Sequence, residues 1–387
     1  MRILFISTGL GTGGAEMTLL RLLGALPETV STAVVSLTVE DAIGKQIEDL
    51  GVPVHALQLG VKLSALGAGS RLAAITRAFR PDVIQGWMYH ANLAAHWVRR
   101  QSMPSVPLAW GIRQSLSGAR REKLTTRAVI KLGAWLSPAA DAIVYNAQRS
   151  AEDHESKGFA GIRRIVIPNG VDCEAFRPDP GKRTQLRHTL GIGDETLLLG
   201  QVARYHPMKG HAILLDAVST LRRRGLAVEV LMAGKGVDEA NAELQSRCRR
   251  LDLTGHVHLL GRRGDVDDLW QAVDVGVSPS EWGEGFPTAV AEAMACGVPC
   301  VVTDVGDSAL LVSDRSLVVA PGKPVTLADA IAGLARAGAD ARRALGQRLR
   351  ERVAAQYGVD LMARRFLGLY ESLMAGNAAR SNSPCVG

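Results

Sequence analysis

The sequence predicts an α/β protein with two doubly wound parallel-sheet domains, and three observations predict this class. The chain has 387 residues, of which 47% are hydrophobic and 21% charged, which is enough for two hydrophobic cores. Short apolar runs alternate with helical stretches, as is typical of parallel strands joined by crossover helices. This alternation stops at a loop-rich segment near the middle of the chain and then restarts, which predicts a second unit of the same kind.

The first half begins with a strand, a glycine-rich turn, a helix and a second strand. Apolar residues fall at strand spacing over 2–7 and 32–37 and at helical spacing over 15–26. Because a crossover helix joins parallel strands, the later apolar runs are expected to extend the same sheet. These further strand candidates are residues 54–57, 83–85, 108–111, 142–145 and 165–167.

A cluster of Pro, Gly and Asp over 176–181 suits a connection between domains, so we expect domains at 1–178 and 179–360 with a cleft between them. The amphipathic segment 361–375 predicts a final helix, and the Ser/Asn-rich residues 376–387 predict a loose tail. The strand candidates of the second domain are 197–202, 228–233, 256–260, 275–277 and 299–303.

The composition excludes several classes of protein. The apolar content is too high for a disordered chain, and no run reaches the ~20 apolar residues of a membrane helix. Gly and Glu interrupt the apolar N-terminus where a signal peptide has its core, so we expect a cytoplasmic protein. The five cysteines are scattered without a CxxC pair, which argues against a disulfide framework or a zinc site.

Basic residues exceed acidic ones, 45 to 38, and this formal net charge of +7 favours anionic partners. A local excess lies between residues 99 and 131, where Glu122 is the single acid. With the nearby tryptophans, which prefer the edge of an apolar layer, it predicts a face for an anionic membrane surface; the alternative is a solvated basic face with tryptophans in the core. No nucleic-acid motif accompanies the charge, so we expect no nucleic-acid partner. The residues are Arg99, Arg100, Arg113, Arg120, Arg121, Lys123, Arg127 and Lys131, with Trp87, Trp97, Trp110 and Trp135.

The first turn contains a GxGxxG pattern, formed by Gly9, Gly11 and Gly14. Alone, it fits a dinucleotide-binding dehydrogenase. More generally, small residues let N–H groups at a helix N-terminus approach phosphate or hydroxyl oxygens, which makes Gly13 and Gly14 candidate binding residues. A structural turn without a ligand is the alternative.

Two segments of the second half could bind a diphosphate. Arg204 and Lys209 follow the first strand of this half, where the carboxyl edge of a parallel sheet faces its ligand. Glu284 and Glu292 flank Pro287, which fits the first turn of a helix whose N–H groups would face an anion. The alternative is a pair of solvated carboxylates and solvated loop cations. The N–H groups in question belong to Gly285, Phe286 and Thr288.

Nearly the whole chain, in order, resembles the retaining GT-B glycosyltransferases of glycosyltransferase family 4, also called group 1. The resemblance implies two Rossmann-like domains that face each other across a cleft. The matching segments are Gly13-Gly14-Ala15-Glu16, Met88-Tyr-His90-Ala-Asn92-Leu93, Pro168-Asn-Gly-Val-Asp172, Phe176-Arg-Pro178, Arg204 with Lys209-Gly210, Ala233-Gly-Lys-Gly236, Leu260-Gly-Arg-Arg-Gly-Asp-Val266, Ser278-Pro-Ser280, Glu284-Gly-Phe-Pro287 and Glu292-Ala-Met-Ala-Cys-Gly-Val-Pro299.

The resemblance also implies roles for the donor-side residues. Arg204 and Lys209 neutralise the leaving diphosphate, Glu284 holds sugar hydroxyls and Glu292 bonds the ribose. Gly14 approaches the donor phosphates when the cleft closes, Arg262 lies near the nucleobase, and the final helix packs on the first domain. The donor is then a UDP-, GDP- or ADP-sugar. No cofactor and no metal are expected, since no Asp-x-Asp run lies in a loop suited to a metal ion and Arg204 with Lys209 replaces it electrostatically.

The acceptor side departs from the family at one position, because Arg113 stands where many relatives have a histidine. His90 is then the better candidate to bond an acceptor hydroxyl or phosphate, with Asn92 and Arg113 beside it, although a packing or capping histidine remains the alternative. The predicted enzyme retains the anomeric configuration and builds a surface polysaccharide such as lipopolysaccharide or capsule, or a glycolipid, on a glycan or lipid-linked acceptor. Two alternatives stay open: a sugar-nucleotide epimerase of the same architecture and a non-catalytic basic membrane-binding protein.

Overall fold

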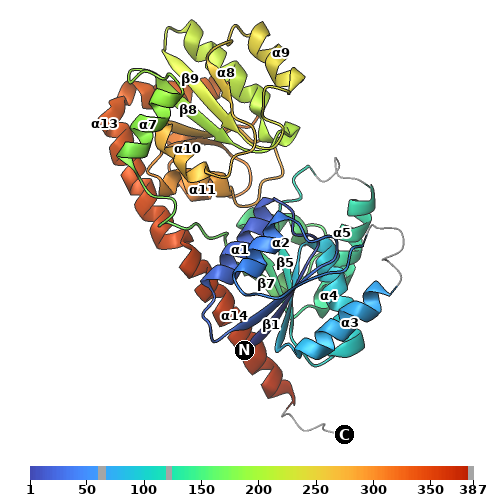
Figure 1. Cartoon of the computed structure of the whole chain (residues 1–387). Helices are drawn as coiled ribbons and strands as arrows, with labels where there is room; N and C mark the ends of the chain where they lie inside the picture. Colours follow the sequence, from blue (N-terminus) through green and yellow to red (C-terminus); the bar gives the residue numbers. More distant parts are fainter. Residues whose placement is uncertain (60–66, 119–123, 382–387) are drawn as a thin grey trace. The chain divides into compact units, whose positions relative to one another are not determined.

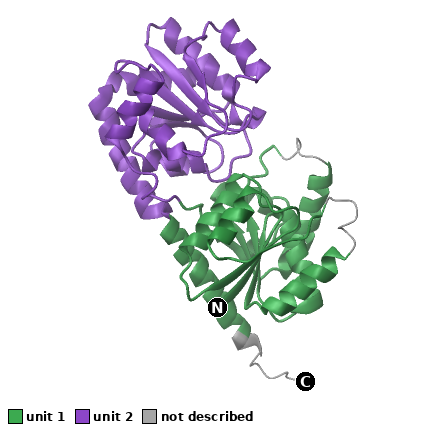
Figure 2. Cartoon of the chain, in the orientation of Figure 1, with its two compact units in different colours: residues 1–170, 359–387 green, residues 171–358 purple. Residues whose placement is uncertain are grey.

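The computed structural model describes residues 1–59, 67–118 and 124–381 and contains two compact units (Figures 1 and 2). Unit 1 consists of residues 1–170 and 359–387, and unit 2 consists of residues 171–358. The first boundary lies before the predicted 178/179, because the N–H of Val171 donates to Tyr357 O over 2.8 Å and Phe176 packs in the core of unit 2. The connection therefore ends before the Pro/Gly/Asp cluster.

Unit 1 contains a parallel sheet of seven strands in the order β3-β2-β1-β4-β5-β6-β7. Each strand coincides with a predicted apolar run to within two residues at either end, so the predicted first sheet is confirmed. The strands are β1 (Arg2–Ser7), β2 (Ser31–Ser36), β3 (Val54–Ala56), β4 (Val83–Trp87), β5 (Leu108–Ile112), β6 (Ala142–Tyr145) and β7 (Arg164–Val166).

Helices cover both faces of this sheet (Figure 1). Along β1 the side chains alternate, so that Ile3 and Phe5 pack with α1, α2 and α14, whereas Leu4 and Ile6 pack with α3, α4, α5 and α6. Such two-sided burial explains why the strands are almost continuously apolar. The helices are α1 (Gly14–Ala25), α2 (Ala42–Asp49), α3 (Ala68–Phe79), α4 (Tyr89–Ser102), α5 (Leu124–Leu136), α6 (Gln148–Glu155) and α14 (Val359–Ser381), with 3-10 turns η2 (Ser137–Ala139) and η3 (Gly161–Arg163).

The C-terminal helix α14 belongs to unit 1 and lies beside α1 (Figure 1). Phe366 and Tyr370 are fully buried, and the Tyr370 hydroxyl donates to Gln85 Oε1 in β4 over 3.1 Å. The helix continues to Ser381, so the loose tail predicted from residue 376 is wrong for 376–381, and the rest of that segment lies outside the described residues.

Unit 2 repeats the arrangement with six parallel strands in the order β10-β9-β8-β11-β12-β13. The prediction missed only β13, which has two residues and therefore no detectable period. The elements are α7 (Pro180–Thr189), β8 (Leu197–Val202), η4 (Pro207–Lys209), α8 (His211–Arg223), β9 (Val228–Ala233), α9 (Ala242–Arg250), β10 (Val257–Leu259), α10 (Val266–Ala272), β11 (Val275–Ser278), α11 (Thr288–Ala295), β12 (Cys300–Thr303), α12 (Ser308–Val312), η5 (Arg315–Leu317), β13 (Val318–Val319) and α13 (Pro324–Tyr357), which is kinked at Gly338.

Both sheets share one strand order, in which the first and fourth strands of each unit are neighbours. The order of connections reverses between these two strands, and in open α/β sheets ligands bind at the carboxyl ends of the strands at this reversal. The loops after β1 and β4 in unit 1, and after β8 and β11 in unit 2, are therefore the candidate ligand-binding loops of the two sheets.

Candidate functional site

In unit 2, the loops after β8 and β11 pack directly against each other. The N–H of Glu281 donates to Met208 O over 2.8 Å. Gly210 has φ +64°, and a Cβ built on it would overlap Pro279 O. Only glycine fits this position without strain, and the close approach brings Lys209 next to the loop that carries Glu284.

Lys209 and Glu284 form an ion pair at this contact. Lys209 Nζ donates to Glu284 Oε1, and the Ser280 hydroxyl donates to the same oxygen over 2.6 Å. The glutamate is only 8% exposed. Burial alone would raise the pKa of Glu284, but Lys209, the Ser280 hydroxyl and the more distant Arg204 outweigh it and lower that pKa below its ordinary value. Glu284 is therefore an ionised, buried carboxylate and not a solvated loop residue.

The two predicted cations of the loop after β8 have different environments. Arg204 is exposed, whereas Lys209 is half-buried and its carbonyl accepts a hydrogen bond of 2.7 Å from Gln201 Nε2. This bond fixes the backbone of Lys209 to β8. Near Glu284, the loop after β8 thus carries Lys209 on a fixed backbone and the solvated Arg204.

The helix α11 begins one residue later than expected, with Pro287 as its N-cap. Phe286 packs its ring in the core against Tyr357, and Thr288 N–H donates to Phe286 O over 3.0 Å. Of the three predicted N–H groups, that of Thr288 is therefore already engaged, whereas those of Gly285 and Phe286 have no backbone acceptor among the described residues. Glu292 is 8% exposed, which excludes the alternative of a solvated helix face.

The sequence interpretation missed a third loop at this site, after β12. Gly306 has φ +60°, and a Cβ there would overlap the carbonyls of Glu284 and Gly285. The N–H of the next residue, Asp307, donates to Gly285 O over 3.0 Å, and Asp307 is 8% exposed. The loop after β12 thus packs directly against the backbone of Glu284 and Gly285. Gly306 was the detectable signal, since a lone glycine just after a strand often marks close backbone approach.

Arg262, predicted to lie near a nucleobase, is exposed in the loop after β10. The preceding Gly261 accepts from Gly234 N–H and donates to Val237 O, each over 2.7 Å. These bonds join the loops after β9 and β10, so the backbone next to Arg262 is held in place by hydrogen bonds.

In unit 1, Gly13 and Gly14 are exposed at the start of α1, after β1. A Cβ on Gly13 would overlap the carboxylate of Glu16, whereas a Cβ on Gly14 would meet nothing within 4 Å. The Glu16 carboxylate thus folds back over the helix N-terminus, where a dinucleotide phosphate would have to bind. Any phosphate that binds at this helix end, of a dinucleotide or of a sugar nucleotide, would therefore require the Glu16 side chain to move aside.

The loop after β4 carries His90, which is exposed in the first turn of α4. Met88, the N-cap of this helix, has φ +76°. A positive φ is strained for a residue with a side chain and often occurs at functional sites. The strained backbone makes the Met88–His90 turn a candidate functional segment, and it assigns no role to the His90 side chain.

Two predicted acceptor residues face the interior instead. Asn92 is 2% exposed; its Nδ2 donates to Gly111 O over 3.2 Å and its Oδ1 accepts from Gly111 N–H over 3.1 Å. Its amide therefore joins α4 to β5 and is not available to an acceptor. The expectation that Asn92 contacts the acceptor is corrected accordingly.

Arg113 is 7% exposed and stacks on Trp87, with the guanidinium carbon 4.2 Å from the ring centroid. It donates to Ile167 O over 3.2 Å and to Asn169 Oδ1 over 3.4 Å, and Phe366 of α14 lies on its other side, 5.2 Å away. Burial lowers its pKa to about 9. Arg113 is thus a core residue of unit 1 and not an exposed acceptor contact, which corrects the second expectation.

The predicted basic, Trp-rich face is smaller than the sequence suggested. Trp87 and Trp110 are fully buried in the core, and Arg99 pairs with Asp141 over 3.4 Å. Arg120, Arg121 and Lys123 lie outside the described residues. Two parts of the face remain exposed. On α4 these are Trp97, which is 42% exposed, and Arg100. On the outer face of α5, Leu124 is 77%, Leu132 45% and Trp135 76% exposed, with Arg127 and Lys131 exposed between them.

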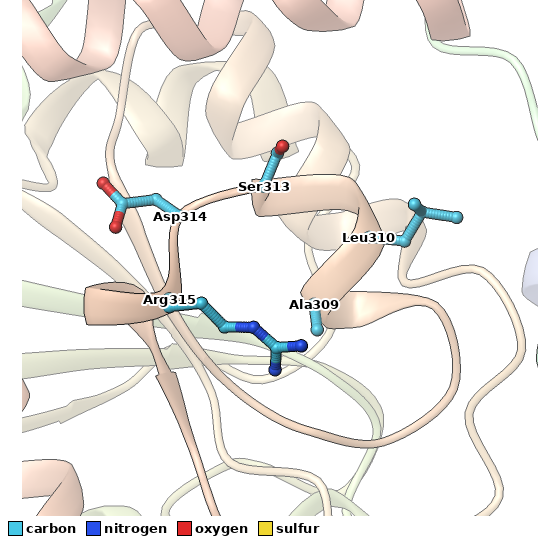
Figure 3. Close-up of a pocket in the computed structure, with 5 residues that line it drawn as sticks. All are labelled: Ala309, Leu310, Ser313, Asp314 and Arg315. Atoms are coloured by element: carbon cyan, nitrogen blue, oxygen red, sulfur yellow. The ribbon is translucent and has the colours of Figure 1, made fainter.

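Within the described ranges, no three His, Cys, Asp or Glu residues converge as a metal site, and no helix is both long and apolar enough to cross a membrane. Asp265 and Asp267 have Asp-x-Asp spacing, but Arg263 and Lys182 pair with them. A pocket of about 340 Å³ lies on α12, where the side chains of Asp314 and Arg315 point apart (Figure 3). The Asp314 side chain accepts from Ser316 N–H at the start of η5 and is therefore already engaged.

Two regions match models of glycosyltransferase families. Residues 12–175 match "Glycosyltransferase Family 4" and residues 196–337 match "Glycosyl transferases group 1". The lipopolysaccharide core biosynthesis mannosyltransferase LpsB of Rhizobium meliloti is 28% identical over 60% of the chain and 66% of its own length. An Escherichia coli galactosyltransferase, which uses UDP-Gal and a diphosphoundecaprenol-linked GlcNAc, is 31% identical over 39% of each chain. The chain thus matches only about a third to two thirds of the length of its curated relatives.

Among solved structures, that of HepE from Anabaena in complex with UDP superimposes with a TM-score of 0.83 at 22% identity, over 96% of this chain and all of that one. At this identity the similarity shows the fold. The two parallel sheets, this GT-B neighbour and the two family matches agree: the chain belongs to the group 1, family 4 glycosyltransferases and has their GT-B fold.

Proposed function

We propose that this protein transfers a sugar from a nucleotide-sugar donor to a hydroxyl of a glycan or lipid-linked acceptor, with retention of the anomeric configuration and without a metal ion. The product is a surface polysaccharide or glycolipid, and the reaction takes place in the cytoplasm. The relatives that act on lipopolysaccharide core and on a diphosphoundecaprenol-linked sugar support this acceptor class, and the UDP complex of HepE supports the donor class.

The observation that carries the proposal is the cluster of Arg204, Lys209 and Glu284 at the strand-order reversal of unit 2. Departure of the sugar leaves negative charge on the diphosphate and positive charge on the anomeric carbon. Two cations and the free N–H groups of Gly285 and Phe286 stabilise the first charge, and a carboxylate beside them holds the sugar hydroxyls. A metal ion has no separate task in this arrangement, since the cations supply the same charge.

Retention is proposed on the family resemblance together with the arrangement of the site. The acceptor hydroxyl attacks from the face that the diphosphate leaves, and its proton passes to a phosphate oxygen as the bond to the sugar breaks. Lys209 and Ser280 both hold Oε1 of Glu284, and in the proposed mechanism this carboxylate holds a sugar hydroxyl instead of attacking the anomeric carbon. Attack by a carboxylate, through a covalent glycosyl-enzyme, is the alternative.

Arg204→Ala tests the function, because Arg204 is exposed and its loss should not disturb the fold. Donor turnover is expected to fall about 100-fold or more, as for removal of one transition-state charge stabiliser. Arg223→Ala, on the exposed end of α8, is the matched control. UDP-, GDP- and ADP-sugars are screened first by thermal shift with EDTA present, which tests the donor class and metal independence together. Product analysis separates transfer from epimerisation, and a wild-type protein that only isomerises the donor sugar overturns the proposal.

The proposal includes an anionic membrane surface as the partner of the outer face of α5. Leu124, Leu132 and Trp135 are exposed on the same helix as Arg127 and Lys131. Apolar side chains that enter the headgroup region, with cations beside them, are the combination that binds anionic bilayers. A lipid-linked acceptor would reach the enzyme at such a surface.

Vesicle co-sedimentation tests this partner, with phosphatidylglycerol–phosphatidylcholine vesicles compared with phosphatidylcholine alone. Arg127→Glu and Lys131→Glu are each expected to weaken binding about fivefold or more, and added salt should weaken it further. Lys157→Glu, an exposed lysine elsewhere on unit 1, is the control. Binding that ignores salt and both charge reversals refutes the assignment.

A further inference from the structure

We propose that Ser280 is a positioning residue that assigns different tasks to the two oxygens of Glu284: Oε1 is held by Ser280 and Lys209, and Oε2 is left to accept a hydrogen bond from a donor-sugar hydroxyl. This inference rests on the proposed function. It concerns how the site recognises the sugar and goes beyond the assignment of Glu284 to sugar binding.

The hydrogen bonds of Glu284 are unequally divided. Oε1 accepts from the Ser280 hydroxyl over 2.6 Å and from Lys209 Nζ. Across the described part of the chain, Oε2 accepts no hydrogen bond, and it is not among the fully buried polar atoms that lack a partner. An ionised carboxylate oxygen that keeps some accessibility beside a fixed partner oxygen is ready to accept from a ligand.

Ser280 is itself held firmly. It is 2% exposed, and its carbonyl accepts from the Thr303 hydroxyl of β12 over 2.5 Å. Thr303 is 1% exposed and also donates to Ser278 O over 3.3 Å. The short serine side chain therefore starts from a fixed backbone, whereas Lys209 has a flexible stem that must also serve the diphosphate. Because its one hydroxyl makes a single directed bond, Ser280 sets the rotation of the carboxylate.

The arrangement determines the chemistry that Glu284 can recognise. An ionised carboxylate only accepts hydrogen bonds, so the sugar must present a donor, that is, a hydroxyl or an N–H, at this place. A sugar that lacks that group leaves Oε2 desolvated and unpaired, and sites built this way reject such analogues strongly.

The test compares UDP-glucose with UDP, since the two ligands differ only in the sugar. In Ser280→Ala, affinity for UDP should stay within about twofold of wild type, because UDP has no sugar hydroxyl for Glu284 to bind. Affinity for UDP-glucose, and the kcat/KM of its turnover, should fall about tenfold, which corresponds to one hydrogen bond to a charged group. Ser219→Ala is the matched control, since Ser219 is also buried and donates one bond, to Leu251 O. If UDP-glucose proves not to be the preferred sugar, the pair is replaced by the nucleotide sugar found in the donor screen and its nucleoside diphosphate.

A pH profile supplies a readout that general damage to the fold would not move. Ser280 helps lower the pKa of Glu284, so its removal should move the acid limb of kcat/KM to higher pH. The charges that face Glu284, Lys209 and Arg204, are unchanged in this variant, as is Asp307 beside Gly285. Thr303→Val, which keeps the shape of the side chain but frees the Ser280 carbonyl, should produce a smaller shift in the same direction.

The outcomes separate the inference from the proposed function. If wild type binds no nucleotide sugar, the proposed function fails and the inference fails with it. Suppose that wild type binds its donor. If Ser280→Ala then binds the nucleotide sugar as tightly as wild type does, and the acid limb of its kcat/KM profile lies at the same pH, the inference is overturned and the proposed function stands. Should Ser280→Ala not fold, Thr303→Val decides in the same way, and an unchanged acid limb in that variant overturns the inference.

Discussion

A double-mutant cycle on Lys209 and Glu284 tests whether this ion pair is part of the folded core of unit 2. In Lys209→Met, Glu284 loses its strongest attractive partner while its side chain stays only 10% exposed. Breaking a fully buried pair costs about 3–5 kcal/mol. Because Lys209 is 22% exposed and Ser280 still bonds Glu284, we expect a smaller loss, about 2 kcal/mol.

The second arm of the cycle replaces the acid. Glu284→Gln keeps the shape and leaves Lys209 able to reach solvent, so its cost should be about 1 kcal/mol. In the double variant no uncompensated charge remains, and its total cost should be about 1 kcal/mol less than the sum of the two single costs. Urea unfolding followed by circular dichroism measures all three, and donor binding should be lost in every variant that lacks Lys209.

The sign of the pH dependence is an internal check on this cycle. The folded-state pKa of Glu284 lies below its ordinary 4.5, so the pair stabilises the protein fully above pH 4.5 and loses this contribution as pH falls through the lower folded value. The penalty of Lys209→Met should therefore shrink in acid. Strictly additive costs, or a penalty that is the same at neutral and at acid pH, would refute the reasoning.

Three further predictions concern the rest of the structure. Arg113→Met should leave the free energy of unfolding within about 1 kcal/mol of wild type or raise it, because Arg113 Nε and Nη2 are buried without a hydrogen-bond partner among the described residues. A loss above about 2 kcal/mol by urea unfolding contradicts this. His154 is buried, and burial lowers its pKa to about 4. The free energy of unfolding, measured as a function of pH, should therefore fall as the pH decreases from about 6.5 to 4, because the unfolded chain binds a proton that folded His154 does not. His154→Phe should make this pH dependence weaker. Gly210→Ala should destabilise unit 2 by more than about 2 kcal/mol, since the new Cβ overlaps Pro279 O at a positive φ; a melting temperature equal to that of wild type contradicts the close approach.

The sheets could be predicted because their signal is local. Strands buried on both faces are short apolar runs, and β1, β6, β8 and β9 have the predicted bounds to the residue. β13 was not predicted, because its two residues are too few to show the alternating hydrophobic pattern of a strand. The proximity of Lys209 and Glu284 could also be predicted from topology, because the loops after β8 and β11 meet at the strand-order reversal wherever the sheet forms.

The acceptor side was predicted less well because burial depends on distant parts of the chain. Arg113 was taken for an exposed cation, and what buries it is Trp87 at the end of β4 and Phe366 in α14. Asn92 was taken for a ligand contact, and what occupies it is the backbone of Gly111. Neither partner could be identified from the spacing around the residue itself, because each contact exists only once the sheet and the last helix are in place.

A basic net charge could not separate Arg204 from Lys209 either, because burial distinguishes the two cations. Both cations follow one strand within six positions, but Arg204 is solvated while Lys209 is already paired with a buried carboxylate. Under the proposed function, Arg204 attracts the diphosphate over a long range, and salt screens this attraction. Lys209 can bind the diphosphate only by sharing its ammonium group between the phosphate and Glu284. Lys209 therefore couples the diphosphate to the sugar: a phosphate that draws charge from Lys209 leaves Glu284 more reliant on the sugar hydroxyl. A nucleoside diphosphate without a sugar cannot supply that hydroxyl, so the site favours the intact donor over its own product.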